Sequence, residues 1–158
     1  HPHAGVSGVL YSTASAITDN FQRFEANPAA LADAVPDIFN QPAIVEHVAL
    51  CIVDALIGQY EGMQRSFLHY AAPVNQLRFS RDPVALDVSS LEELNRIRER
   101  AGAPAVTNRF ALYSNAEYLL ELGTGDPRRI EWIRIDLPDG PSAPETGATN
   151  VSTTASSR

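Results

Sequence analysis

The chain has 158 residues, of which 44% are hydrophobic, and this suits one ordinary domain with a core of its own. Its formal net charge of -7 argues against a nucleic-acid partner, because phosphate binding requires a basic patch. All 12 basic residues are arginines. Chemistries that need a lysine of this chain, such as a Walker phosphate loop or a Schiff base, are therefore excluded.

Cys51 is the single cysteine and lies in an apolar run, where we expect a buried small side chain. One cysteine permits neither an intrachain disulfide nor a self-contained iron–sulfur cluster. No run of about 18 apolar residues occurs, so no transmembrane segment is expected. The first residue is not methionine, which leaves open both a cytoplasmic chain and an exported one that has lost a signal peptide.

The first half of the chain predicts one long helix, one short helix and two strands. Apolar residues recur at helical spacing over residues 27–39, where Asn27 is a suitable cap and Pro28 suits the first helical position. A short helix starting at Pro42 leads into a strand at residues 49–56, whose core is apolar and β-branched. A second buried strand is predicted for residues 73–80.

The second half predicts two helices and a third strand. Residues 82–102 have the clearest helical pattern, with Asp82 as the cap, Pro83 in the first position and Gly102 at the end. A shorter helix is expected over residues 115–123, and a strand over residues 129–137 with a phase slip after Trp132. The Pro-, Gly-, Ser- and Thr-rich tail, residues 138–158, predicts a disordered or extended segment.

The alternation of strands and helices predicts an α/β fold over residues 1–137. We expect a small, three-layer-like domain with a partial, mostly parallel sheet. Three strands make a thin sheet for a chain of this length. The sheet is therefore expected to be completed by residues of a missing N-terminal half or of a partner chain.

Two histidines among the first three residues raise the question of a metal site at a mature N-terminus. Square-planar copper or nickel binding through His3 would use the backbone nitrogen of Pro2, which has no N–H to lose. A copper brace made by the amine and ring of His1, with His47 or His69 as the second ligand, stays open. The alternative is that these histidines bind no metal.

Three residues near the start of the chain are candidates for cofactor binding. A glycine-rich turn before a helix can hold a phosphate on backbone N–H groups, which makes Gly5 and Ser7 candidates. The spacing matches neither established nucleotide motif, and close packing of the backbone is the alternative explanation. Asn20 lies in the polar stretch TDNFQRF, where surface capping explains it equally well.

Three aspartates form a candidate hard-metal or acid–base cluster. Asp54 lies near the end of an apolar strand, where a carboxylate is costly unless it is paired or placed in the crevice in which α/β proteins bind ligands. Asp82 and Asp87 lie near the start of the following helix. For Asp82, a purely structural role as a helix cap is the alternative.

Several short motifs occur together along residues 1–136, namely HPHAGVSGVLY, IVDAL before a glycine, DPVALD and LGTGDP. In this order and spacing they resemble the C-terminal half of the bacterial and archaeal family called domain of unknown function 362. The residues that match its first motif are His1, Ala4, Gly5 and Val6, with Ser7 in place of threonine. Tyr11 and Ser12 stand where lysine and asparagine are common in that family.

The resemblance implies an α/β domain whose sheet is completed by an N-terminal half. His1 would then mark a truncation, a proteolytic cut or a processed boundary. Asp54, Asp82 and Asp87 match recurrent acidic positions of the family. Some members carry ferredoxin-like cysteines, which this sequence lacks.

Two functions of different classes follow. The first is half of a redox or metal-dependent enzyme, with a crevice lined by His1, Asp54, Asp82 and Asp87 and a divalent metal bound by the first two. It requires these side chains to converge, since metal–ligand bonds are roughly 2 to 2.6 Å long. The second is a non-catalytic binding or accessory subunit of a larger complex. It predicts an open sheet edge or an exposed apolar face.

Overall fold

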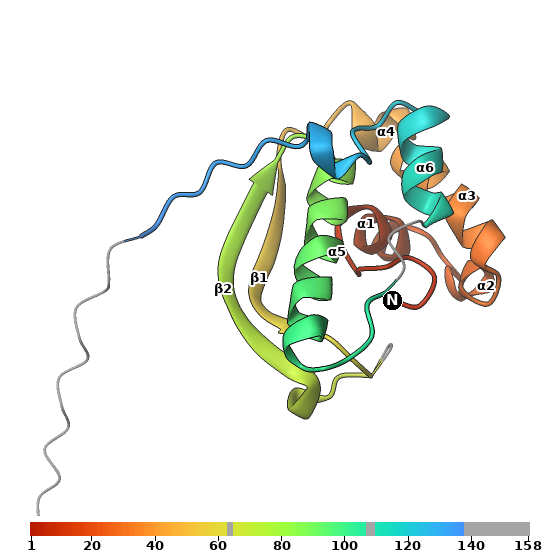
Figure 1. Cartoon of the computed structure of the whole chain (residues 1–158). Helices are drawn as coiled ribbons and strands as arrows, with labels where there is room; N and C mark the ends of the chain where they lie inside the picture. The colour runs from red at the N-terminus through yellow and green to blue at the C-terminus, as the bar shows by residue number, and fades with distance from the viewer. Residues whose placement is uncertain (63–64, 107–109, 138–158) are drawn as a thin grey trace, which may run out of the picture.

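Six helices and two strands make up the part of the chain that the computed structural model describes, residues 1–62, 65–106 and 110–137 (Figure 1). The elements are α1 (Val9–Ile17), α2 (Gln22–Glu25), α3 (Pro28–Phe39), α4 (Pro42–Val45), β1 (Cys51–Gln59), β2 (Ala71–Ser80), α5 (Pro83–Arg100) and α6 (Ala111–Tyr118), with 3-10 turns η1 (Leu68–Tyr70) and η2 (Pro127–Arg129). The tail predicted for residues 138–158 lies outside the described residues.

The sheet consists of β1 and β2 in antiparallel pairing, so the prediction of a mostly parallel sheet is wrong. Cys51 pairs with Ser80 at one end and Gln59 with Ala71 at the other. Residues 60–70 join the strands and contain the turn η1, whereas a parallel pair needs a longer crossover that is usually a helix. The apolar runs in the sequence predicted where both strands lie, but such runs do not indicate whether two strands pair in parallel or antiparallel.

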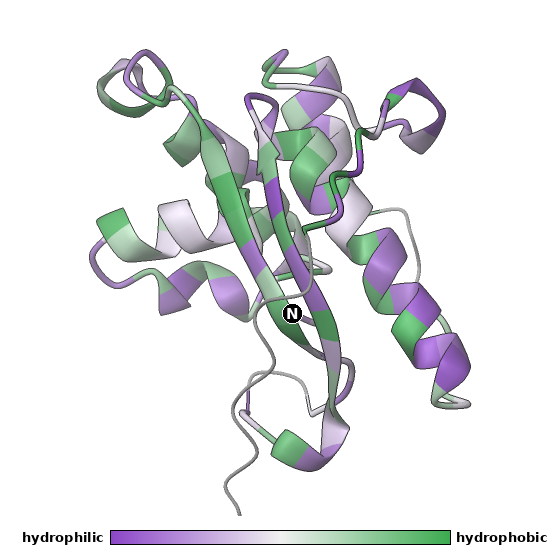
Figure 2. Ribbon diagram, turned by 90° about the vertical axis from the view of Figure 1, so that its left-hand side faces the viewer, coloured by the Kyte–Doolittle hydropathy of each residue, from purple (hydrophilic) through white to green (hydrophobic). Residues whose placement is uncertain are grey.

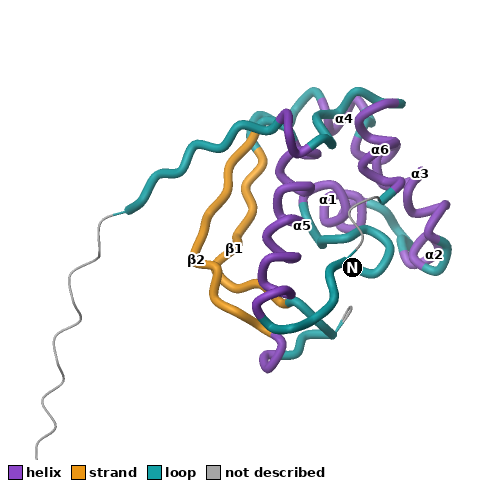
Figure 3. Tube along the Cα trace, in the orientation of Figure 1, coloured by secondary structure: helices purple, strands orange, loops and turns teal. Residues whose placement is uncertain are grey.

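The third predicted strand is not formed. Residues 130–137 leave the body of the molecule near the end of β2 as an extended segment without strand pairing (Figures 1 and 3). The sequence has the alternation of a strand, but a strand also needs a neighbour with which to exchange backbone hydrogen bonds. Within the described residues this segment has no such neighbour.

Helices cover the sheet on one side. α5 packs against both strands, and α1 and α6 pack against α5 (Figures 1 and 3). The opposite face of the sheet has no helix in front of it (Figure 2). The expected three-layer-like arrangement is therefore also wrong for the described part of the chain, because a helical layer is present on only one face.

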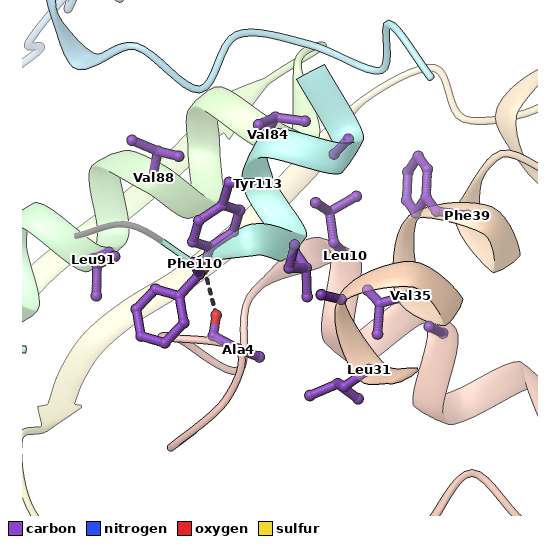
Figure 4. Close-up of a cluster of buried hydrophobic side chains, with 14 of the residues drawn as sticks. Ala4, Leu10, Leu31, Val35, Phe39, Val84, Val88, Leu91, Phe110 and Tyr113 are labelled. Carbon is purple, nitrogen blue, oxygen red and sulfur yellow. Dashed lines mark hydrogen bonds between the residues drawn. The ribbon is translucent and has the colours of Figure 1, made fainter. Parts of the chain in front are cut away.

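The hydrophobic core lies mainly between helices, not between helices and sheet (Figure 4). Leu10 of α1, Leu31 and Val35 of α3, and Leu112 of α6 are fully buried there. The Tyr113 hydroxyl donates a 2.7 Å hydrogen bond to the Ala4 carbonyl. This buried bond attaches the first residues of the chain to α6.

The predicted starts of the two longest helices are confirmed. The Asn27 side chain accepts hydrogen bonds from the Ala29 and Ala30 N–H groups, as a cap of α3 should. The Asp82 carboxylate accepts from the Ala85 N–H at the start of α5. Since each cap is followed by a proline in the first helical position, the local sequence alone determines where these helices begin.

The last helix differs from its prediction, because α6 spans Ala111–Tyr118 and ends well before Gly123. Its buried face consists of Leu112, Tyr113 and Ala116. The first two residues precede the predicted start at residue 115. Packing against α3 thus selects an earlier helix than the following leucines suggest.

Candidate functional site

Asp87 is buried in α5 and holds the beginning of α1. Its carboxylate accepts hydrogen bonds from the backbone N–H groups of Val9 at 2.6 Å and Leu10 at 3.0 Å. These first-turn N–H groups have no partner within their own helix, and the Gly8 cap has no side chain to offer them one. A carboxylate from another helix therefore accepts the hydrogen bonds that an N-cap side chain would normally accept.

Gly8 is required by this arrangement. A Cβ atom at position 8 would lie 2.0 Å from Oδ1 of Asp87, far inside van der Waals contact. Asp87 is only 1% exposed and cannot swing aside into solvent. Close approach of the backbone, the alternative explanation for the glycine-rich start, is therefore the role of Gly8.

Burial raises the pKa of the Asp87 carboxyl group from an ordinary 3.8 to about 7. The two backbone N–H donors act in the opposite direction, since they stabilise the charged form. With this pKa, the charge of Asp87 is expected to change near neutral pH.

Asp82, the N-cap of the same helix, makes the same kind of contact. One carboxylate oxygen accepts from the Ala85 N–H at 2.8 Å, and the other accepts from the Thr124 N–H at 2.8 Å. A Cβ atom at Gly123 would lie 1.9 Å from Oδ1 of Asp82. The cap role considered for Asp82 is confirmed, and the same side chain also fixes the loop after α6.

The DPVALD motif thus supplies two aspartate–glycine pairs, Asp87 with Gly8 and Asp82 with Gly123. In each pair the carboxylate binds backbone N–H groups of a segment that glycine allows to come close. All four carboxylate oxygens accept hydrogen bonds from backbone N–H groups, one of them within α5 itself. The motif supports the fold, and its oxygens are not directed into a ligand crevice.

Asp54 lies on the opposite face of the sheet from α5 and is exposed. Its Oδ1 accepts a 3.0 Å hydrogen bond from the N–H of Leu56, where the pairing of β1 and β2 shifts register. Asp54 therefore binds the backbone of its own strand at an irregularity in the pairing. Asp82 and Asp87 bind other backbone N–H groups, and the described residues contain no group of three such side chains arranged to hold a metal, so the predicted cluster of three aspartates does not assemble.

His1 has a different set of neighbours. Its ring is 1% exposed, and its Nδ1 accepts from the N–H groups of His3 and Ala4, both at 3.2 Å. Its Nε2 lies 4.0 Å from a carboxylate oxygen of Glu25, to which the Tyr11 hydroxyl donates a hydrogen bond. Burial, followed by the bond to Glu25, raises the pKa of Tyr11 above its ordinary value. We call these three residues the His1–Tyr11–Glu25 cluster.

The structure does not gather the predicted metal ligands. His1 lies beside Tyr11 with ring centroids 4.6 Å apart, whereas Asp54 lies on the uncovered face of the sheet. Of the two alternative brace ligands, His69 belongs to η1 and stacks against Tyr70. Across residues 1–62, 65–106 and 110–137, no group of three or more His, Cys, Asp or Glu side chains is arranged to hold a metal ion.

The three predicted cofactor-binding residues have local packing roles. Gly5 has a φ of 75°, and a Cβ atom there would lie 3.0 Å from the Phe110 ring. The Ser7 carbonyl accepts from the Ser12 hydroxyl, and Asn20, with a φ of 52°, precedes α2. The N–H groups that a phosphate would require at the start of α1 are already bonded to Asp87.

Two surface grooves contain some of these predicted residues. A groove of about 400 Å³ between α1 and β1 includes Ser7 and Asp54. A second groove, of about 320 Å³, includes His1, Gly5 and Arg98. Arg98 is held by the carbonyls of Tyr60 and Pro104 and by Glu61, so its donors are directed to the protein itself.

The most unusual surface is one that the sequence interpretation did not pinpoint. No helix lies in front of one side of the sheet (Figure 2), and we call this side, defined by four of the exposed apolar side chains of β1 and β2, the outer sheet face. They are Ile52 at 58% exposure, Leu56 at 48%, Leu77 at 54% and Phe79 at 57%. In the sequence, both strands have apolar residues at odd and at even positions. This pattern is typical of strands that are covered on both faces of a sheet.

Cys51 lies on the inner side of the same sheet and is buried, as predicted. Burial, together with the nearby charges of Asp87 and Asp82, raises the pKa of its thiol. A thiol in these surroundings is a poor nucleophile. Cys51 therefore contributes to packing.

Comparisons with family models, with curated proteins and with solved structures return no match for this chain. None of the helices in the described ranges has the length and apolar character needed to cross a bilayer. The geometry of the molecule is thus the basis for a functional conclusion.

Proposed function

We propose that this chain is a non-catalytic binding or accessory unit of a larger assembly. Its outer sheet face and the open edges of its sheet bind a protein partner that contributes further β-strands. The observation that carries this proposal is the uncovered apolar face formed by Ile52, Leu56, Leu77 and Phe79. Apolar side chains gathered on one exposed face are typical of interaction sites in soluble proteins.

The size of the sheet supports the same conclusion. A two-stranded sheet is only marginally stable alone, and within the described ranges each strand has one edge without a strand neighbour. Such edges offer rows of backbone donors and acceptors to an added strand. A partner that adds strands would satisfy these groups and bury the apolar face at the same time.

The charge on this face narrows the chemistry of the partner. Asp54 is the one charged residue of β1, and it projects from the same face as Ile52 and Leu56. A complementary strand would therefore present mainly aliphatic or aromatic side chains and an arginine or lysine opposite Asp54.

The alternative, a metal-dependent or redox enzyme, receives less support. It needs His1, Asp54, Asp82 and Asp87 to face one crevice, and these residues contact different parts of the molecule. Asp82 and Asp87 already bind backbone N–H groups. We therefore favour the binding unit.

The proposal is tested by binding of an apolar dye, anilinonaphthalene sulfonate, to the isolated full chain. We expect strong fluorescence from the wild type and a loss of more than half of it in Phe79→Glu. Leu119→Glu is the matched control, because Leu119 is 72% exposed but follows α6, away from the sheet. Equal fluorescence from all three proteins, or none from the wild type, would overturn the proposal.

A further inference from the structure

Residues Glu131–Leu137, which we call the arm, have the properties of a strand without a partner. Three of its side chains are almost fully exposed, with Ile133 at 82%, Ile135 at 80% and Leu137 at 84%. No backbone N–H or carbonyl group of the arm bonds to another described residue. An alternating apolar segment of this kind is stabilised when a second strand supplies hydrogen bonds and covers one side.

The base of the arm is fixed to the body of the molecule. The Ile130 N–H donates to the Pro127 carbonyl, and the Trp132 ring lies 5.4 Å from the guanidinium carbon of Arg78. Arg78 is itself held by the Ser89 carbonyl at 3.1 Å. Beyond Trp132 the arm runs away from its own sheet (Figures 1 and 3). Among the described residues, no segment of the same chain lies beside it as a strand neighbour.

We propose that the arm pairs in antiparallel register with the arm of a second copy of this chain. This deepens the proposed function, on which it rests, by naming the first partner that the unit binds. The favoured register is centred on Ile135, which lies opposite its own equivalent. Ile133 then lies opposite Leu137 of the second copy, and Arg134 lies opposite Asp136.

Charge complementarity selects this register. In a strand, alternate residues point to the same side, so Arg134 and Asp136 share one side while Ile133, Ile135 and Leu137 share the other. Centring the pair on Arg134 would place two arginines opposite each other. Centring it on Ile133 would place Ile135 opposite Glu131. Only the register centred on Ile135 gives two ion pairs and three apolar pairs.

Arg134 and Asp136 are already close enough to interact within one arm. The Arg134 Nε lies 2.7 Å from the Asp136 carboxylate, and both side chains are exposed. An exposed pair of neighbours in sequence contributes little to stability. Pairing of two arms replaces it with two cross-strand ion pairs of the same chemistry.

The apolar side of the paired arms explains the link to the outer sheet face. Two arms together present six aliphatic side chains, from Ile133, Ile135 and Leu137 of each copy. A two-stranded ribbon is marginal in water unless such a side is covered. The outer sheet faces carry exposed apolar side chains of the same type, so we expect the ribbon to lie against them.

Charge exchange in the arm tests this proposal in the full chain. Arg134→Asp places like charges opposite each other in the homodimer, and so does Asp136→Arg. We expect each single variant to dimerise at least about tenfold more weakly than the wild type, measured by sedimentation equilibrium. An equimolar mixture of the two variants restores opposite charges at every pair, so it should recover dimers. The double variant Arg134→Asp/Asp136→Arg should recover them as well.

Cysteine crosslinking tests the register itself. In a Cys51→Ser background, Ile135→Cys lies opposite its own equivalent and should form a disulfide-linked dimer under mild oxidation. Ile133→Cys alone should form little, because its position faces residue 137. A mixture of Ile133→Cys and Leu137→Cys should crosslink efficiently. Equal crosslinking of the two single variants would overturn the register.

The outcomes separate this inference from the proposed function. If the wild type is monomeric, or if its dimers are insensitive to the charge variants, the pairing of arms is overturned. Dye binding that still depends on Phe79 would leave the outer sheet face as the binding surface. If the charge variants weaken the dimer but Phe79→Glu changes neither dye binding nor dimerisation, the arms pair without the outer sheet face, and the proposed function fails.

Discussion

The two sides of this small sheet differ in how completely their interactions are satisfied. On the inner side, Asp87 binds the start of α1 and Arg78 binds the Ser89 carbonyl of α5. On the outer side, Ile52 and Phe79 are paired across the strands, and both side chains are exposed. Polar groups are therefore paired where the fold is fixed, while the uncovered surface is apolar and suited to a partner.

The largest effect on stability is expected when a methyl group is added at Gly8, on the inner side of the sheet. Gly8→Ala places a Cβ atom against the Asp87 carboxylate, so the bonds to α1 must break or the helices must separate. We expect a loss of about 3 to 4 kcal/mol in the free energy of unfolding, measured by urea denaturation. Gly102→Ala is the control, because a Cβ atom there meets no atom within 4 Å and adds only the strain of its positive φ. Equal losses for both variants would contradict the account of Gly8.

The next effect is a dependence of stability on pH. Asp87 has a folded-state pKa of about 7, above its ordinary value of 3.8, so the folded protein keeps a proton that the unfolded chain releases. The stability that the folded protein gains by keeping this proton is therefore fully present below about pH 4, and it is lost as the pH rises towards 7. We expect a loss of about 3 kcal/mol over this range, because a difference of one pKa unit corresponds to about 1.4 kcal/mol.

Asp87→Asn provides the matched measurement, since an amide of the same shape cannot titrate. The difference in unfolding free energy between wild type and Asp87→Asn should change with pH between 4 and 7, and the carboxyl resonance of Asp87 should titrate near the upper limit. A constant difference across this range would show that the carboxyl group is ionised throughout.

The smallest effect is expected on the outer side. Asp54→Ala removes an exposed side chain with a local bond to Leu56. We expect a change of less than about 1 kcal/mol, well below the effect of Gly8→Ala. A larger loss would show that the register shift in β1 is a structural requirement of the sheet, and would weaken the contrast between its two sides.

The sequence predicted local features better than long-range ones. The starts of α3 and α5 followed from Asn27, Asp82 and the prolines after them, because a cap acts within one helical turn. The direction of β2 was not predictable in this way, because it depends on how residues 60–70 fold back. The third strand failed for a related reason, since alternation shows that a segment can pair but not which segment it pairs with.

The candidate site shows the same limit. An aspartate that binds a metal and one that binds backbone N–H groups look alike in sequence. The feature that separates them here is the distant glycine of each pair, and the pairs join residues far apart in the chain, Gly8 with Asp87 and Asp82 with Gly123. The resemblance to a family that completes its sheet with a further half stays a prediction.

The central claim is that the outer sheet face binds a partner and is not needed to hold the fold together. Sedimentation velocity of the wild type and of Ile52→Glu/Phe79→Glu, two positions paired across the strands, tests it most directly. We expect the wild type to associate as its concentration rises, whereas the variant should remain a folded monomer with unchanged helical circular dichroism. A wild type that stays monomeric at every concentration, or a variant that unfolds, would contradict it.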